Sequence, residues 1–225
     1  MLSNFEQKKC RLCSRFSSAL NGFFFRFFGR LCCSWINRRT HDQFRDRVAS
    51  FNACAPRCAC EAHPTSRHSS GVVEGDEIIS RFVFSPLHVH RKTGAIMPNL
   101  FSHAERQGCS VQRELANNEE IASFVRDFLK GGNDRHWLGV VSAYCSDLRA
   151  IRLDGVDERA ICIYDTAEPA NPAHAEVCWS GVALEEGDSG ELRKLLLDAF
   201  SSGSPVSPAV YRSGDVLRGV GGRGT

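Results

Sequence analysis

The chain has 225 residues, 42% of them hydrophobic and 24% charged, which is typical of a globular protein. The uncharged run at residues 16–25 falls well short of the roughly 20 residues that span a bilayer, so we expect no transmembrane segment. The net charge of +2 conceals an asymmetry, since residues 1–73 carry +8, residues 74–200 carry −8 and residues 201–225 carry +2. This pattern predicts a basic Cys- and Phe-rich arm (1–73), a globular domain (74–200) and a disordered Gly/Ser tail (201–225).

The arm contains one regular pattern, at residues 11–35. On a helical projection, Phe and Leu side chains fall on one side and Arg11, Arg15, Arg26 and Arg30 on the other. A basic amphipathic helix of this kind suits peripheral contact with an anionic membrane or docking into a partner protein. The positive charge also gives non-specific affinity for nucleic acid. A start codon placed too far upstream would produce such a segment too, so residues 1–73 need not belong to the functional protein.

Seven of the eleven cysteines lie in the arm, where zinc is the cofactor to consider. The "CRLC" stretch is a half-site, and "CAPRCACEAH" supplies a candidate metal set: Cys54, Cys58, Cys60 and His63. The other four cysteines, Cys109, Cys145, Cys162 and Cys178, stand singly among apolar residues. Isolated cysteines of this kind, in an odd total, favour a reducing compartment, and we expect a cytoplasmic protein.

The domain begins with predicted strands at 77–85 and 109–115, followed by the strongest predicted helix, 117–132. Three more strands are expected at 137–144, 160–165 and 175–180, and a second amphipathic helix at 188–200. This order does not alternate regularly. It predicts an α+β fold with a mostly antiparallel sheet of about five strands covered by two amphipathic helices, which we expect on one face.

Histidines supply the first candidate catalytic residues. His88 and His90 are two apart, so they would share a face if they continued a strand, although Pro86 favours a solvated loop instead. A metal site there would be completed from His103, Asp165, Glu168, His174 or Glu176. Without a metal, either histidine could serve as a general base.

The stretch "YDTAEPANPAHAEV" (164–177) supplies the other two candidates, Asp165 and His174. Its two prolines restrict the loop between two predicted strands, which suits either a positioned catalytic pair or a rigid connection. Cys109 or Ser110 is a candidate nucleophile, but no GxSxG pattern accompanies them, and apolar packing is the simpler role for the cysteine.

Together, "FSHAERQGCSVQRE" and "YDTAEPANPAHAEV" resemble a loose group of small bacterial proteins of unassigned function, which share an "SV-x-R" strand followed by "NPAHA". The resemblance covers about residues 80–180 and implies a bacterial cytoplasmic origin, with no activity to transfer. The chain departs from the pattern at Thr166–Glu168.

Two functions remain open from sequence. The first is a non-catalytic accessory or interaction module, in which the acidic domain recognises a protein partner. The alternative is a small hydrolase using His88, His90, Asp165 and His174, with or without a metal. The two hypotheses differ in one structural expectation, because the hydrolase requires its four residues to meet in one pocket.

Overall fold

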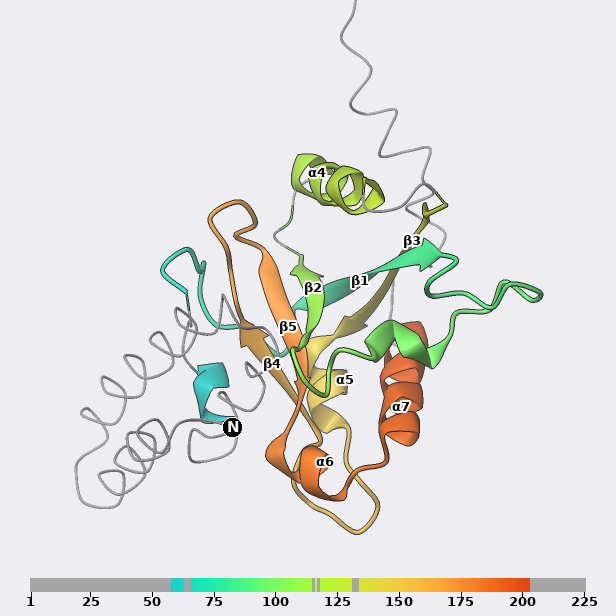
Figure 1. Cartoon of the computed structure of the whole chain (residues 1–225). Helices are drawn as coiled ribbons and strands as arrows, with labels where there is room; N and C mark the ends of the chain where they lie inside the picture. Colours follow the sequence, from blue (N-terminus) through green and yellow to red (C-terminus); the bar gives the residue numbers. More distant parts are fainter. Residues whose placement is uncertain (1–57, 63–65, 115, 117, 131–133, 203–225) are drawn as a thin grey trace, which may run out of the picture.

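The computed structural model describes residues 58–62, 66–114, 116, 118–130 and 134–202, and its centre is a five-stranded antiparallel sheet (Figure 1). The strand order is β3-β1-β2-β5-β4, and every neighbouring pair is antiparallel. The strands are β1 (Ile78–Ser85), β2 (Cys109–Arg113), β3 (His136–Tyr144), β4 (Ile161–Asp165) and β5 (His174–Trp179). The predicted α+β class and antiparallel sheet are therefore confirmed, with strand bounds close to those expected.

The two long helices form as expected but lie on opposite faces of the sheet, whereas we expected them on one face. α4 (Asn118–Leu129) packs on one face, while α7 (Ser189–Ser202) packs on the other, together with α5 (Cys145–Ala150) (Figure 1). Asp188 caps α7, because its Oδ1 accepts a hydrogen bond from the Glu191 N–H at 2.8 Å. The shorter elements are α6 (Gly181–Glu186) and the 3-10 turns η2 (Ala59–Ala62) and η3 (Pro98–Phe101).

The α7 face carries the main hydrophobic core. Strand residues of alternate register, such as Ile79 on β1 and Val111 on β2, are fully buried against this layer. Leu192, Leu196 and Phe200 of α7 are equally buried, and the Phe200 ring lies 4.9 Å from the Phe101 ring of η3. Apolar side chains thus fill this side of the sheet from β3 to β4.

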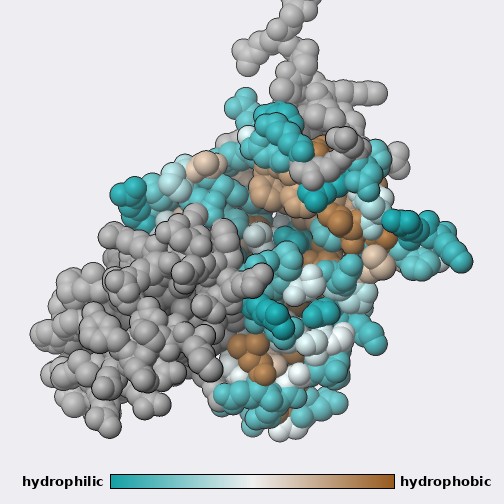
Figure 2. All heavy atoms as spheres, viewed as in Figure 1, coloured by the Kyte–Doolittle hydropathy of each residue, from teal (hydrophilic) through white to brown (hydrophobic). Residues whose placement is uncertain are grey.

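The α4 face carries a second apolar cluster near β1 and β3. Phe82 and Phe84 point to this side, where their rings stack on Phe124 at 4.9 Å and on Phe128 at 4.1 Å, respectively. Trp137 of β3 completes the cluster. Figure 2 shows hydrophobic side chains gathered beneath the hydrophilic outer surface of this helix. α4 therefore rests on a small aromatic cluster over β1 and β3, which we call the α4 cluster.

The described part of the predicted arm packs against the domain. Contacts between the two therefore continue across residue 73, where we predicted the arm to end. Val73 is 3% exposed and belongs to the main core. Glu61, in η2, accepts a hydrogen bond from the Ile163 N–H of edge strand β4 and forms ion pairs with Arg149 and Arg159. These contacts cover the β4 edge, which would otherwise expose unpaired backbone groups.

One cysteine departs from expectation. Cys162, which we expected as an isolated apolar side chain, forms a disulfide with Cys58 of the arm. Cys109, Cys145 and Cys178 are buried, as the sequence indicated. The predicted amphipathic helix at 11–35 and the tail from residue 203 lie outside the described residues. No helix in the described part of the chain is long and apolar enough to cross a membrane.

Candidate functional site

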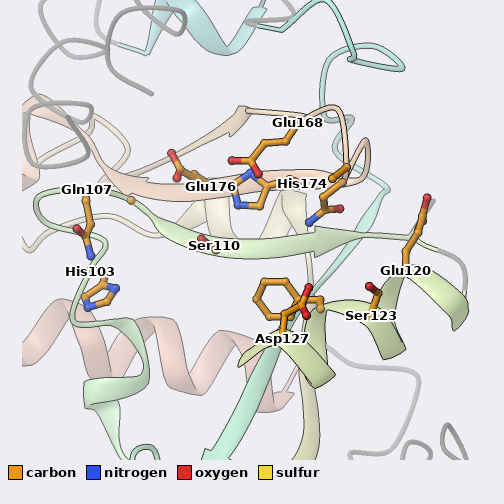
Figure 3. Close-up of a pocket in the computed structure, with 13 residues that line it drawn as sticks. His103, Gln107, Ser110, Glu120, Ser123, Asp127, Glu168, His174 and Glu176 are labelled. Carbon is orange, nitrogen blue, oxygen red and sulfur yellow. The ribbon is translucent and has the colours of Figure 1, made fainter. Parts of the chain in front are cut away.

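A pocket of about 500 Å³ opens over the β2 and β5 portion of the sheet, beside α4 (Figure 3). Three regions supply its walls: α4, the loop before β2, and the β4–β5 connection. Among the described lining residues, polar side chains predominate, with one phenyl ring and no lysine or arginine. The lining residues are His103, Gln107, Gly108, Ser110, Glu120, Ser123, Phe124, Asp127, Glu168, Ala170, Asn171, His174 and Glu176.

The floor of the pocket is set by strand register. Ser110 of β2 pairs with Glu176 of β5, and Gln112 pairs with His174, so Ser110, His174 and Glu176 share the face opposite the main core. His174 is 6% exposed and Glu176 only 2%. The sheet thus places an imidazole and a carboxylate, two residues apart, at the base of the pocket.

His174 is held by Thr166 at the end of β4. Its Nδ1 lies 2.8 Å from the Thr166 hydroxyl oxygen and 3.2 Å from the Thr166 carbonyl oxygen. Both contacts use the same ring nitrogen, so the orientation of the imidazole is defined from behind, and its Nε2 is the atom left for the pocket side.

Glycine is required where the chain approaches Glu176. Gly108 has φ +83°, and a Cβ at this position would lie 2.9 Å from the Glu176 carboxyl group. The left-handed backbone and the close contact both disfavour any other residue. Gly108 therefore lets the loop enter β2 while Glu176 keeps its place in the pocket.

One face of α4 forms a wall of the pocket. Glu120, Ser123, Phe124 and Asp127 follow the i, i+3, i+4, i+7 spacing that aligns side chains along one side of a helix. The adjacent stripe of the helix packs on the α4 cluster, and Phe124 belongs to both. Docking of this helix on the aromatic rings thus decides where two of the pocket's carboxylates stand.

The β4–β5 connection forms the opposite wall. Glu168 and Asn171 exchange backbone hydrogen bonds at 2.9 and 3.0 Å, which closes a tight turn with Pro169 and Ala170 at its tip. The Asn171 carbonyl also accepts from the His174 N–H at 3.1 Å. The two prolines therefore belong to a short, internally bonded hairpin, in line with the expected rigid connection.

Four carboxylates give the pocket a negative character: Glu120, Asp127, Glu168 and Glu176. The pKa of Asp127 is lowered by its hydrogen bond and ion pair with Lys130, so this carboxylate is ionised at neutral pH. The pKa of His103 is lowered by partial burial and by the positive charge of Arg81, so its imidazole is neutral there. At neutral pH the lining therefore attracts positively charged groups.

His88 and His90, two of the four sequence candidates, are not among the pocket's lining residues. His88 Nδ1 accepts a hydrogen bond from the Phe84 N–H at 3.1 Å, and burial together with Arg81 lowers its pKa to about 4. It thus serves as a neutral acceptor that supports the turn after β1. His90 is exposed, and its Nδ1 lies 3.2 Å from the Thr93 hydroxyl in the loop that projects from the sheet.

Asp165, the third candidate, does not line the pocket either. It is 2% exposed and lies 3.5 Å from Arg113 Nη1, and burial raises its pKa. Arg113 also forms a 2.7 Å ion pair with Glu77 and donates to the backbone carbonyls of Gly71 and Val72. Asp165 thus belongs to a buried ionic network that holds the start of the domain, and only His174 of the four candidates reaches the pocket.

The predicted zinc site loses one ligand, because Cys58 forms a disulfide with Cys162. In a disulfide its sulfur is not a thiolate and cannot bind a metal. Cys54, His63 and the side chain of Cys60 lie outside what the structure describes, so the rest of that set stays a prediction. Within the described residues, no group of three or more His, Cys, Asp or Glu side chains is arranged to hold a metal ion.

The two candidate nucleophiles lie in different environments. Cys109 is fully buried, its sulfur lies 3.5 Å from the Leu100 carbonyl oxygen, and burial raises its pKa, all of which fit the apolar packing role. Ser110 lines the pocket.

Of the five residues that the sequence offered to complete a site with His88 and His90, the structure brings His103, Glu168, His174 and Glu176 to one pocket, without Asp165 and without either of those two histidines. Sequence reasoning missed the α4 wall, because Glu120 and Asp127 read as the solvated side of an amphipathic helix. Comparisons with protein-family models, curated proteins and solved structures gave no match for this chain.

Proposed function

We propose that the protein is a non-catalytic interaction module whose acidic pocket binds a positively charged segment of a partner protein. The observation that carries the proposal is the composition of the pocket of about 500 Å³, in which the described lining residues include four carboxylates and no lysine or arginine. The excess of negative charge over residues 74–200 acts in the same direction, because it raises the local concentration of a basic partner.

The hydrolase alternative receives less support. It required His88, His90, Asp165 and His174 to converge, and His174 alone lines the pocket. The other side chains have structural partners, such as the Phe84 N–H for His88 and Arg113 for Asp165. A general base needs a reacting group within hydrogen-bond reach, and these three residues do not provide it at the pocket.

A cytoplasmic location and a bacterial origin complete the proposal. The free, buried thiols of Cys109 and Cys145 are compatible with a reducing compartment, whereas disulfides such as Cys58–Cys162 are more common in oxidising compartments. Alkylation of thiols in intact cells, followed by mass spectrometry, distinguishes a reducing from an oxidising compartment. Labelled Cys58 and Cys162 would support the cytoplasm, and an intact disulfide would contradict it.

The binding proposal is tested by neutralising one wall of the pocket. Glu120→Gln removes a carboxylate that lines the pocket, and Glu119→Gln removes its neighbour in the same helical turn, which does not. Titration of the full chain with a fluorescent basic peptide should give about threefold weaker binding for Glu120→Gln and no change for Glu119→Gln. Equal affinities for the two variants, or no binding by the unaltered protein, would contradict the proposal.

A further inference from the structure

We propose that the pocket is selective for a guanidinium group, so that the residue it recognises in its partner is an arginine rather than a lysine. This inference rests on the proposed function, because it names the chemical group that the acidic pocket receives. It follows from the kinds of atoms that line the pocket and from where they stand.

The acceptors stand on two sides of the pocket. Asp127 and Glu120 belong to α4, whereas Glu168 and Glu176 lie beyond β2 on the hairpin and on β5 (Figure 3). An ammonium group directs its donors from a single nitrogen, but a guanidinium presents five N–H donors in one plane, pointing in divergent directions. Acceptors that face each other across a cavity are therefore matched better by the guanidinium.

His174 supplies a ring nitrogen among these carboxylates. The Thr166 carbonyl oxygen, 3.2 Å from Nδ1, only accepts hydrogen bonds, which favours the proton on Nδ1 and leaves a lone pair on Nε2. Within the described part of the chain, Nε2 makes no hydrogen bond, although the residue is 94% buried and lines the pocket. An acceptor on a side chain this deeply buried favours a ligand that brings a donor.

Asn171, on the hairpin, supplies another acceptor without a described donor. Its Oδ1 is buried and accepts no hydrogen bond from the described residues, and the side chain also lines the pocket. His174 Nε2 and Asn171 Oδ1 thus add two acceptor positions to the four carboxylates. A ligand that brings several donors in different directions contacts more of these acceptors than a ligand that brings one charge.

Phe124 offers the remaining feature that arginine uses. Its ring lines the pocket next to Asp127, and a planar guanidinium stacks on an aromatic face more readily than an ammonium does. The protein already uses this arrangement one turn further along α4, where the Arg135 guanidinium lies 4.9 Å from the centre of the Phe128 ring.

The test compares two capped tripeptides that differ only in a central arginine or lysine, titrated into the full chain and followed by NMR. We expect the arginine peptide to bind about tenfold more tightly. Equal or tighter binding of the lysine peptide overturns guanidinium selectivity but leaves the acidic interaction module standing. Binding of neither peptide overturns both.

A second arm of the test removes the neutral acceptor. His174→Asn keeps an atom in place of Nδ1 for Thr166 and deletes Nε2, so we expect arginine affinity to fall about tenfold towards that of lysine, while lysine affinity changes little. His136→Asn, at an exposed position of β3, is the matched control and should behave as the unaltered chain. An unchanged arginine preference in folded His174→Asn contradicts the assignment.

The unaltered protein gives a third readout that needs no folded variant. The ¹⁵N spectrum of its imidazole groups should show His174 with the proton on Nδ1, and only the arginine peptide should shift the Nε2 signal. A proton on Nε2 overturns the role of this atom. All titrations are repeated with Arg11, Arg15, Arg26 and Arg30 changed to Gln, so that the arginines of the predicted amphipathic helix do not compete for the pocket.

Discussion

On the face of the sheet that α7 covers, side chains from all five strands join one apolar layer, and the helix contributes fully buried leucines and Phe200. On the opposite face, the same strands present Phe82 and Phe84 near one edge but Ser110, His174 and Glu176 in the middle. Alternation along each strand produces both faces from the same residues. The first face therefore supplies most of the stability, and the second supplies the positions that a ligand can reach.

The largest expected effect lies on the α7 face. Phe200 is 0% exposed and contacts Phe101, so Phe200→Ala should lower the free energy of unfolding by about 3–5 kcal/mol, measured by urea denaturation. Under conditions where the variant is folded, peptide affinity should remain that of the unaltered chain. A loss of affinity in the folded variant would mean that the two faces are not independent.

A smaller loss of stability is expected from the α4 cluster, together with a loss of binding. Phe128 is half-buried and stacks on Phe84, so Phe128→Ala should cost about 2 kcal/mol. Because the same helix carries Glu120 and Asp127, loosening it should also weaken peptide binding. Together with Phe200→Ala, this variant separates the faces, and unchanged affinity in Phe128→Ala would contradict a role for α4 docking in the pocket.

The third expected effect is a dependence of the free energy of unfolding on pH, caused by the titration of His88. Its pKa is about 4 in the folded chain and about 6.5 when unfolded, so between these values the unfolded chain binds more protons. The free energy of unfolding should therefore fall as the pH is lowered from about 6.5 to about 4.

His88→Asn isolates this contribution, since an amide oxygen in place of Nδ1 can still accept the Phe84 N–H without titrating. Urea unfolding at several pH values should show a shallower decline for the variant than for the unaltered chain. The same slope in both would show that other groups, such as His103 beside the same Arg81, account for it.

The smallest effect on stability belongs to the pocket itself. Glu120→Gln and Glu119→Gln should each change the free energy of unfolding by no more than about 0.5 kcal/mol, as is usual for helix surface positions. Thermal denaturation of both variants checks this expectation. A large destabilisation by Glu120→Gln alone would indicate that its carboxylate stabilises the fold, and the binding experiment would then need the remaining pocket residues.

Part of the pocket floor could be predicted from the sequence. "NPAHAEV" indicated a strand that carries His174 and Glu176 on one face, and the period of two along a strand is a local property. His88 and His90 were misplaced as candidates because Ser85 and Pro86 end β1, so the turn that follows directs His88 back to the Phe84 N–H. Asp165 does not line the pocket because its carboxylate contacts Arg113, which lies 52 residues earlier in the sequence.

By itself, the sequence determined the elements: five strands and two amphipathic helices, each specified by hydrophobic periodicity, caps and breakers that act within a few residues. Only the tertiary structure decided that α4 and α7 take opposite faces, that Cys58 reaches Cys162, and that an α4 wall meets a β5 floor. These outcomes depend on which buried surfaces find each other across long stretches of chain, and periodicity specifies that a face is apolar without specifying its partner.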